Sequence, residues 1–382
     1  MSATRRMPHA VIPFRAAPPG RCAWRAVIAG LALLLTLAAH AERYIYVDAH
    51  GNRLEVDTAV PGYWPATPKA AVEHVTDTRI GFEIVYRDVI EGTRRGFDDP
   101  SRGAARRALV TEVLRYVDEV LNEDGAVRIE FDESLLSGSG YLAAASAFFR
   151  PVPGYRNGAA FQHITTGEPK DPNLPDMLIR VNFGHTWNET LATPTTSQYD
   201  LFSVLLHEVG HGLGILSLAI DEDAESRIAP GVYSVWDWLM ETGNGNTCWD
   251  EMQPVFVGLP QYLLGQDNGV LLIGAAALTV HGQGPRVYAP NPFRQGSSLS
   301  HFAPSLSGDA VMQPSIPRGR ARRAYLPVEK ATLYDLGYTN IELGVELPED
   351  LGPEPGPKPA PIPWANPESL PAFRVPFFQH ED

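Results

Sequence analysis

Helical spacing of apolar residues predicts three helices along the chain. Residues 104–122 carry leucine, valine or alanine at every third or fourth position, with arginine and glutamate between them, which is typical of an amphipathic helix. A second helix is expected over 198–213, where apolar residues cover nearly every side, and Thr195, Thr196 and Ser197 are the candidate N-cap residues. A short third helix is expected over 329–336.

Alternating and β-branched runs predict the strands. Residues 43–60 alternate apolar and polar positions around His50, Gly51 and Asn52, which indicates a β-hairpin. The order of strand, helix, several strands and helix favours an α+β fold in which an N-terminal twisted sheet is backed by two helices. The strands after the hairpin are expected at 82–86, 127–131, 141–149 and 177–183.

Changes in composition divide the 382 residues into segments. After residue 214 the periodic pattern weakens and glycine and proline become frequent, which indicates an irregular C-terminal subdomain. Ten prolines follow from Pro348 onward, as in an extended tail. The expected boundaries are a signal peptide at 1–41, a hairpin and linker at 42–75, an N-terminal subdomain at 76–214, a C-terminal subdomain at 215–345 and a Pro-rich tail at 346–382.

The first 41 residues have the pattern of a secretory signal. Arg21 and Arg25 precede an apolar run over 26–39, and Ala39-His40-Ala41 has the small-residue pattern of a cleavage site. The run is shorter than the roughly 20 residues of a spanning helix, although an uncut N-terminal anchor is the alternative. With no second apolar span, we expect an exported protein, periplasmic or extracellular in a bacterium, with no stable membrane anchor after cleavage.

The net charge and the cysteine content restrict the classes of partner and the disulfides that we expect. The chain has 31 Lys and Arg and 45 Asp and Glu; removing 1–41 takes away five arginines and leaves a net charge of −19. Such an acidic protein is a poor partner for nucleic acid or an anionic membrane. Cys248 alone would remain, so no intramolecular disulfide forms, and we expect it to be a small packed side chain. Nothing in the sequence indicates an oligomeric state.

The second expected helix contains the motif H-E-x-x-H. His207 and His211 are four residues apart and therefore lie on one helix face, about 5–6 Å apart at Cβ. Two imidazoles so placed can bind one zinc ion, and Glu208 lies beside that ion as a candidate general base. Because the helix is otherwise apolar, these polar side chains need strong partners, which a metal supplies.

A third ligand must come from elsewhere in the chain. Gly214 extends the motif to H-E-x-x-H-x-x-G, but Ser217 occupies the position where the short form of this pattern has its third histidine. His301 is the best candidate, because Met312 follows it eleven residues later. His281 is a rival that lacks such a methionine.

The motifs around His301 resemble the leishmanolysin-like branch of the metzincin peptidases. In that branch a long insertion separates the glycine from a Ser-His-aromatic motif, here Ser300-His301-Phe302, and a Met-turn follows, here at Met312. The segment 329–338 is similar to the family's C-terminal helix and its Asp-Leu-Gly-aromatic ending. The resemblance covers roughly 80–340. It implies that one catalytic zinc ion lies in a cleft between the two subdomains, bound by His207, His211 and His301 above Met312.

The resulting expectation is a secreted zinc endopeptidase that acts on protein or peptide substrates, with Glu208 as the general base. Some metzincins have a tyrosine two residues after the methionine; Pro314 stands here, and Tyr325 is a possible substitute. The strand over 177–183 is the candidate edge strand for pairing with substrate. Two alternatives stay open: a secreted binding or structural protein with a relict zinc site, or a peptidase of another clan whose third ligand is Glu222, Glu225 or Glu241.

Overall fold

The structure is a computed structural model that describes residues 43–48, 53–57, 64, 67–68, 71–134, 141–220, 223–250 and 253–347. The expected signal peptide, the Pro-rich tail from residue 348 and Glu222 lie outside the described residues, as does most of the segment between the hairpin and residue 71. Within the described part of the chain, no helix has the length and apolar character needed to cross a membrane.

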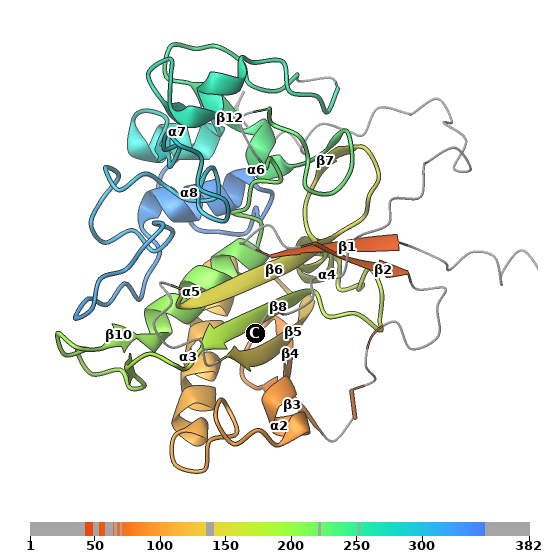
Figure 1. The fold of residues 1–382 in the computed structure, drawn as a ribbon, viewed down its shortest axis with the longest axis vertical. Coiled ribbons are helices and arrows are strands. Elements are labelled where there is room, and N and C mark those ends of the chain that lie inside the picture. The colour runs from red at the N-terminus through yellow and green to blue at the C-terminus, as the bar shows by residue number, and fades with distance from the viewer. Residues whose placement is uncertain are drawn as a thin grey trace, which may run out of the picture.

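A seven-stranded mixed sheet forms the N-terminal part of the molecule (Figure 1). Its strand order is β2-β1-β6-β8-β5-β4-β3. The central strands β4, β5 and β8 are parallel, whereas β6 and the hairpin β1–β2 on one side and β3 on the other are antiparallel to their neighbours. The strands span Arg43–Asp48 (β1), Arg53–Asp57 (β2), Val72–Val75 (β3), Gly81–Tyr86 (β4), Ala126–Ser134 (β5), Ala143–Phe149 (β6) and Met177–Asn182 (β8).

Two long helices pack against this sheet, as the sequence predicts. Helix α3 (Gly103–Leu121) contacts α5 (Leu201–Gly212), and α5 lies along β6 and β8. Every second residue of the central strands faces these helices, which produces one continuous apolar core. Two shorter helices also contact β5: α2 (Arg87–Glu91) and α4 (Ala159–Thr166), the second of which also contacts β6.

The C-terminal part has short elements joined by long loops, and Figure 1 shows it beyond one end of α5. It contains a three-stranded sheet, β12-β13-β14, and the pair of helices α7 (Ala275–His281) and α8 (Pro327–Asp335), which contact each other. The remaining elements are β7 (Gly154–Arg156), β9 (Trp187–Asn188), β10 (Tyr199–Asp200), β11 (Val232–Ser234), α6 (Val235–Trp238), β12 (Met240–Thr242), the 3-10 helix η2 (Pro260–Leu264), β13 (Val270–Leu272) and β14 (Arg286–Val287). The fold is therefore mixed α and β, as expected.

Two expectations about the second helix and its preceding strand are wrong. Helix α5 is not capped by Thr195, Thr196 or Ser197, because Tyr199 and Asp200 first pair with β9 and Asp200 then accepts a hydrogen bond from Ser203 N at the first turn. The strand β8 over 177–182 is not an edge strand, since it lies between β5 and β6.

Candidate metal centre

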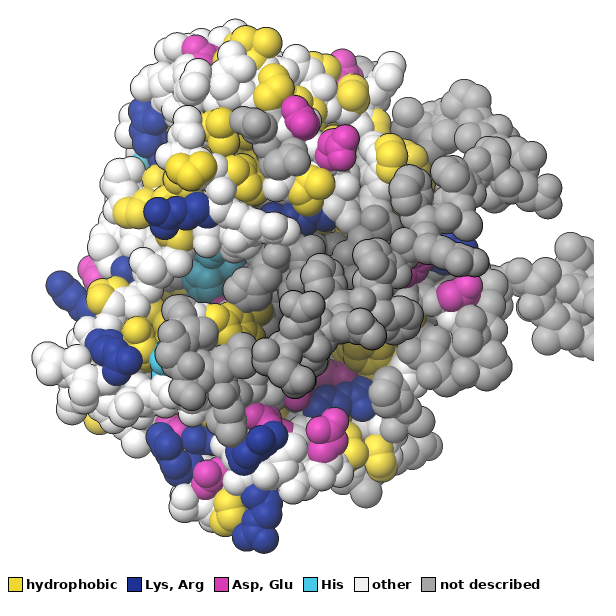
Figure 2. Space-filling view, viewed as in Figure 1, with side chains coloured by type: hydrophobic (Ala, Val, Ile, Leu, Met, Phe, Trp, Pro, Cys, Tyr) yellow, Lys and Arg dark blue, Asp and Glu magenta, His cyan; other side chains and the backbone are white. Residues whose placement is uncertain are grey.

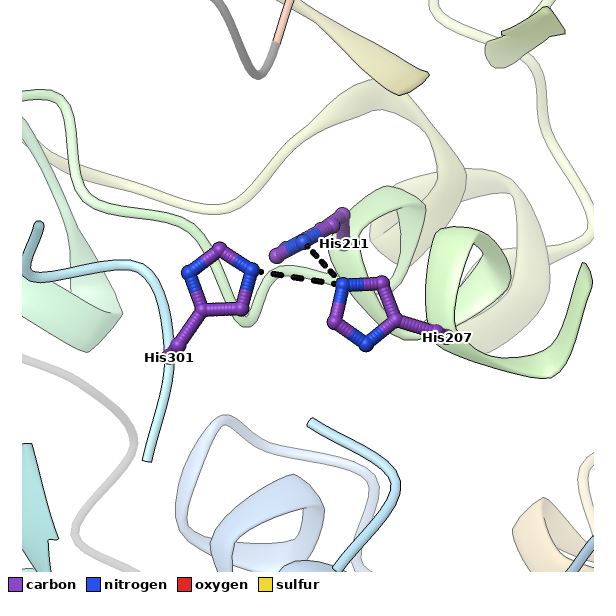
Figure 3. A group of neighbouring side chains, drawn as sticks. All are labelled: His207, His211 and His301. Carbon is purple, nitrogen blue, oxygen red and sulfur yellow. Dashed lines mark hydrogen bonds between the residues drawn. The ribbon is translucent and has the colours of Figure 1, made fainter. Parts of the chain in front are cut away.

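Helix α5 places two of the three predicted ligands in the middle of the molecule. Its apolar residues, among them Leu205, Leu206 and Val209, are buried in the core between the sheet and α3. His207 and His211 lie one turn apart on the face that points away from this core toward the C-terminal part (Figure 3). The helix therefore holds both imidazoles on a rigid, buried support.

His301 reaches the same point from a loop that several hydrogen bonds hold to its surroundings. Ser300 Oγ accepts from Ser217 N at 3.1 Å, and Trp236 Nε1 donates to Leu299 O at 2.6 Å. Tyr288 N donates to His301 O, and Leu299 N donates to Tyr288 O, both at 2.8 Å. Ser217, where a shorter motif would have a histidine, thus helps to hold the segment that carries the third histidine.

The three imidazoles converge on one point with the same ring nitrogen (Figure 3). Nε2 of His207 lies 3.0 Å from Nε2 of His211 and 3.3 Å from Nε2 of His301. All three residues fall in a group whose ligand atoms lie within 4.8 Å of one another. These histidines could therefore hold a metal ion between them.

Backbone carbonyls determine which nitrogen of each ring carries the proton. Nδ1 of His207, His211 and His301 lies 2.8, 2.7 and 2.7 Å from the carbonyl oxygens of Val311, Ile215 and Ser297, respectively. A carbonyl only accepts, so each Nδ1 must donate, and a neutral ring then has a lone pair and no proton on Nε2.

Burial keeps these rings neutral. Desolvation lowers the pKa of His207 to about 4 and that of His301 to about 3, and it lowers the pKa of His211 well below its usual value. Three neutral rings then direct three lone pairs at each other, which is unfavourable unless a cation lies between them. Tetrahedral coordination with Zn–N bonds of about 2.0–2.1 Å separates ligand nitrogens by roughly 3.3 Å, close to the two spacings above.

Glu208 lies at the same site with one oxygen unused. The residue is 5% exposed, and within the described part of the chain its Oε2 has no hydrogen-bond partner. Desolvation raises the pKa of Glu208 to about 8, although the Ala145 backbone N–H acts against this shift. A neighbouring cation would favour the carboxylate. A buried, unsatisfied carboxyl beside three unprotonated nitrogens fits a metal site that binds water.

Met312 packs against α5 beside the two helix ligands. It is fully buried, and a Cβ added at Gly210, between the two helix ligands, would collide with its Sδ. The residue before it, Val311, gives the carbonyl that orients His207. Its own backbone N donates to Glu329 Oε1 at 2.7 Å, so α8 holds the turn in place.

The histidines open into a pocket of about 300 Å³. Figure 2 shows histidine surface in a hollow between the upper and lower parts of the molecule. Tyr325 does not line this pocket: its hydroxyl donates to Leu206 O at 2.9 Å, so it is not the substitute for the tyrosine whose position Pro314 occupies. Several further residues line the pocket although no motif marks them in the sequence: Tyr141, Leu142, Ala143, Tyr199, Ser203, Gln313 and Arg322.

The rival ligands lie elsewhere. Among the described residues, neither Glu225 nor Glu241 belongs to the histidine group, and Glu225 is exposed. His281 lines a separate pocket on the C-terminal part. Cys248 is fully buried among apolar side chains, as predicted, and burial raises its pKa to about 12. The chain matches no protein-family model, no curated protein and no solved structure.

Proposed function

We propose that the protein is an exported zinc endopeptidase of the metzincin type, similar to the leishmanolysin-like branch, that hydrolyses peptide bonds in protein or peptide substrates. One observation carries the proposal: three Nε2 lone pairs and the free oxygen of Glu208 meet in one open pocket. The motif order from His207 through His301 to Met312 supports the same family.

The donor set favours zinc. Three neutral imidazoles and an open position are the usual ligands of a catalytic zinc ion, although copper, nickel and iron also bind imidazole. When bound, zinc supplies a Lewis acid for the carbonyl oxygen of a substrate and acidifies a water molecule. The backbone carbonyls that accept from each Nδ1 orient the rings and increase the basicity of Nε2.

Glu208 has the proton-transfer role in this proposal. Its Oε2 has no protein partner among the described residues and can accept a proton from water in the pocket. The same oxygen can then donate that proton to the amine that leaves. Among the described residues Glu208 forms no ion pair with a basic side chain, so its Oε2 remains available.

The outer edge of β6 is the place where an extended substrate can pair. Leu142 O accepts from Asn182 N, so the backbone N–H and C=O groups of alternate residues from Leu142 onward point toward β8. The backbone groups of the residues between them point toward the outer side of β6. Outward-facing Ala147 and Phe149 pair with β1. Ala143 lines the pocket and has no strand on its outer side within the described chain, whereas the Ala145 backbone N–H is directed at Glu208. We therefore place the substrate on β6 rather than on β8.

The test measures bound metal and casein cleavage on the exported form of the chain, with three variants. We expect about one zinc and cleavage in the wild type, zinc without cleavage in Glu208→Ala, and loss of both in His301→Ala. His281→Ala is the matched control and should behave as the wild type. Tight zinc binding by His301→Ala would contradict the ligand assignment and favour another clan. Zinc without cleavage in the wild type would favour a binding protein with a relict site.

A further inference from the structure

A buried arginine lies in the wall of the metal pocket. Arg322 is 8% exposed and lines the pocket together with the three histidines. Its backbone N donates to Ser203 Oγ at 2.6 Å. Ser203 precedes His207 by one helical turn and lies on the same face of α5, so the arginine is anchored beside the first ligand.

The guanidinium group has donors left over. Nε donates to Gly308 O at 3.0 Å and Nη1 donates to Ser315 O at 2.9 Å. Within the described part of the chain, Nη2 makes no hydrogen bond and Arg322 forms no ion pair with a carboxylate. An arginine has five N–H donors in a planar fork, so two protein contacts hold its orientation and leave one side of the fork for a ligand.

Glu329, a carboxylate that acts electrostatically on Arg322, already has other partners. Glu329 accepts from Met312 N at 2.7 Å and from Leu326 N at 2.8 Å. Among the residues that line the pocket, Glu208 has the only carboxyl group and Arg322 has the only guanidinium group. Arg322 therefore gives one wall of the pocket a positive charge, although the chain as a whole carries −14.

We propose that Arg322 is a specificity-determining residue that binds a carboxylate of the substrate next to the cleaved bond. The inference rests on the proposed peptidase function and names its preferred substrate class. The carboxylate comes either from an Asp or Glu side chain or from the C-terminus of a peptide. The adjacent walls formed by Val204, Pro314 and Ile316 are apolar and suit the methylene groups of such a side chain. A guanidinium–carboxylate pair in a desolvated pocket is stronger than a neutral hydrogen bond.

The test uses matched peptides on the zinc-loaded enzyme. One pair has an amidated C-terminus and differs only in Glu or Gln after the cleaved bond. The other pair has a neutral side chain there and ends at that residue as free acid or amide. We expect kcat/KM to be about tenfold or more higher for the carboxylate member of at least one pair, which identifies the source. Equal rates within both pairs would overturn the inference.

Variants separate recognition from structural support. Arg322→Gln should remove the preference, so that kcat/KM becomes equal within each pair, whereas Arg322→Lys should keep a reduced preference. Arg320→Gln is the control, because Arg320 is exposed and lies outside the pocket. A uniform loss on every peptide in Arg322→Gln and Arg322→Lys would assign the residue a structural role and overturn the proposal.

Binding measurements distinguish this inference from the proposed function. The same four peptides are titrated into zinc-loaded Glu208→Ala and into the double variant Glu208→Ala with Arg322→Gln. Tighter binding of a carboxylate member that disappears in the double variant supports the inference, even if the wild type cleaves nothing and the peptidase proposal fails. Equal binding within both pairs contradicts it.

Discussion

Three imidazoles that each donate Nδ1–H to a backbone carbonyl have only Nε2 left for a ligand. The carbonyls of Val311 and Ser297 come from loops, and that of Ile215 comes from the residue that follows the turn after α5. The ring tautomers are thus determined by the backbone before any ion arrives. Such an arrangement lowers the cost of ordering the ligands when a metal binds.

Gly210 lies between the two helix ligands, His207 and His211. An alanine in a helix is normally more stable than glycine by up to about 1 kcal/mol. Here a Cβ would collide with Met312 Sδ, so Gly210→Ala should instead destabilise the protein by about 1–3 kcal/mol and weaken metal binding. The free energy of unfolding and a competitive zinc titration measure both effects.

Gly308→Ala is the control for this substitution. A Cβ at Gly308 meets no atom within 4 Å and its φ is not in the left-handed region. Its effect should stay within about 0.5 kcal/mol. If Gly210→Ala were as well tolerated as Gly308→Ala, Met312 would not support the helix as closely as described.

Helix α7 is capped at its N-terminus by a side chain of the neighbouring helix α8. No side chain caps α7 at Gly274, and instead Asp335 at the end of α8 accepts from Ala276 N and Ala277 N, both at 2.8 Å. Burial raises the pKa of Asp335 to about 6, although these two hydrogen bonds act in the opposite direction. The cap therefore joins two elements and also carries a titratable group.

This cap predicts a pH dependence of stability. The pKa of Asp335 is about 6 in the folded state and 3.8 in the unfolded chain, so the folded state binds the proton more tightly. This tighter proton binding stabilises the folded state fully below about pH 4. The stabilisation is lost as the pH rises through 6, which lowers the free energy of unfolding by at most about 3 kcal/mol. Urea unfolding of the metal-free protein at pH 4.5 and pH 7 should show a smaller difference in Asp335→Asn than in the wild type. An unchanged difference would contradict the assignment.

The sequence predicts single helices and strands well, but it predicts poorly which elements lie next to one another. The spacing of His207 and His211 and the periodicity of α3 depend on helix geometry alone, and both were found as predicted. His301 was found through a family resemblance rather than through spacing. The interior place of β8 and the pocket position of Arg322 depend on strand order and on the path of long loops, which no local pattern encodes. Arg106, within the helix predicted over 104–122, is buried because it pairs with Glu189 and donates to the carbonyls of Arg95 and Gly96.

For the whole molecule, a bound metal would join the two halves of the chain. Two ligands come from α5, and the third lies 94 residues after the first of them, in the C-terminal part. Zinc at 100 times its dissociation constant should raise the free energy of unfolding by about 2.7 kcal/mol. Thermal unfolding with zinc and with a chelator measures this as a shift in Tm. The shift should be lost in His301→Ala and kept in His281→Ala, and a shift kept in both would place the metal elsewhere.

The hairpin at the edge of the sheet has a consequence for the order of folding. Residues 43–48 form β1, but their partner β6 lies about a hundred residues later, and the loss of chain entropy opposes such long-range pairing. The segment 81–134 can form β4, α3 and β5 early, because its contacts are closer in sequence. Residues 43–48 would therefore join the sheet late, after the strands that pair over shorter distances in the sequence.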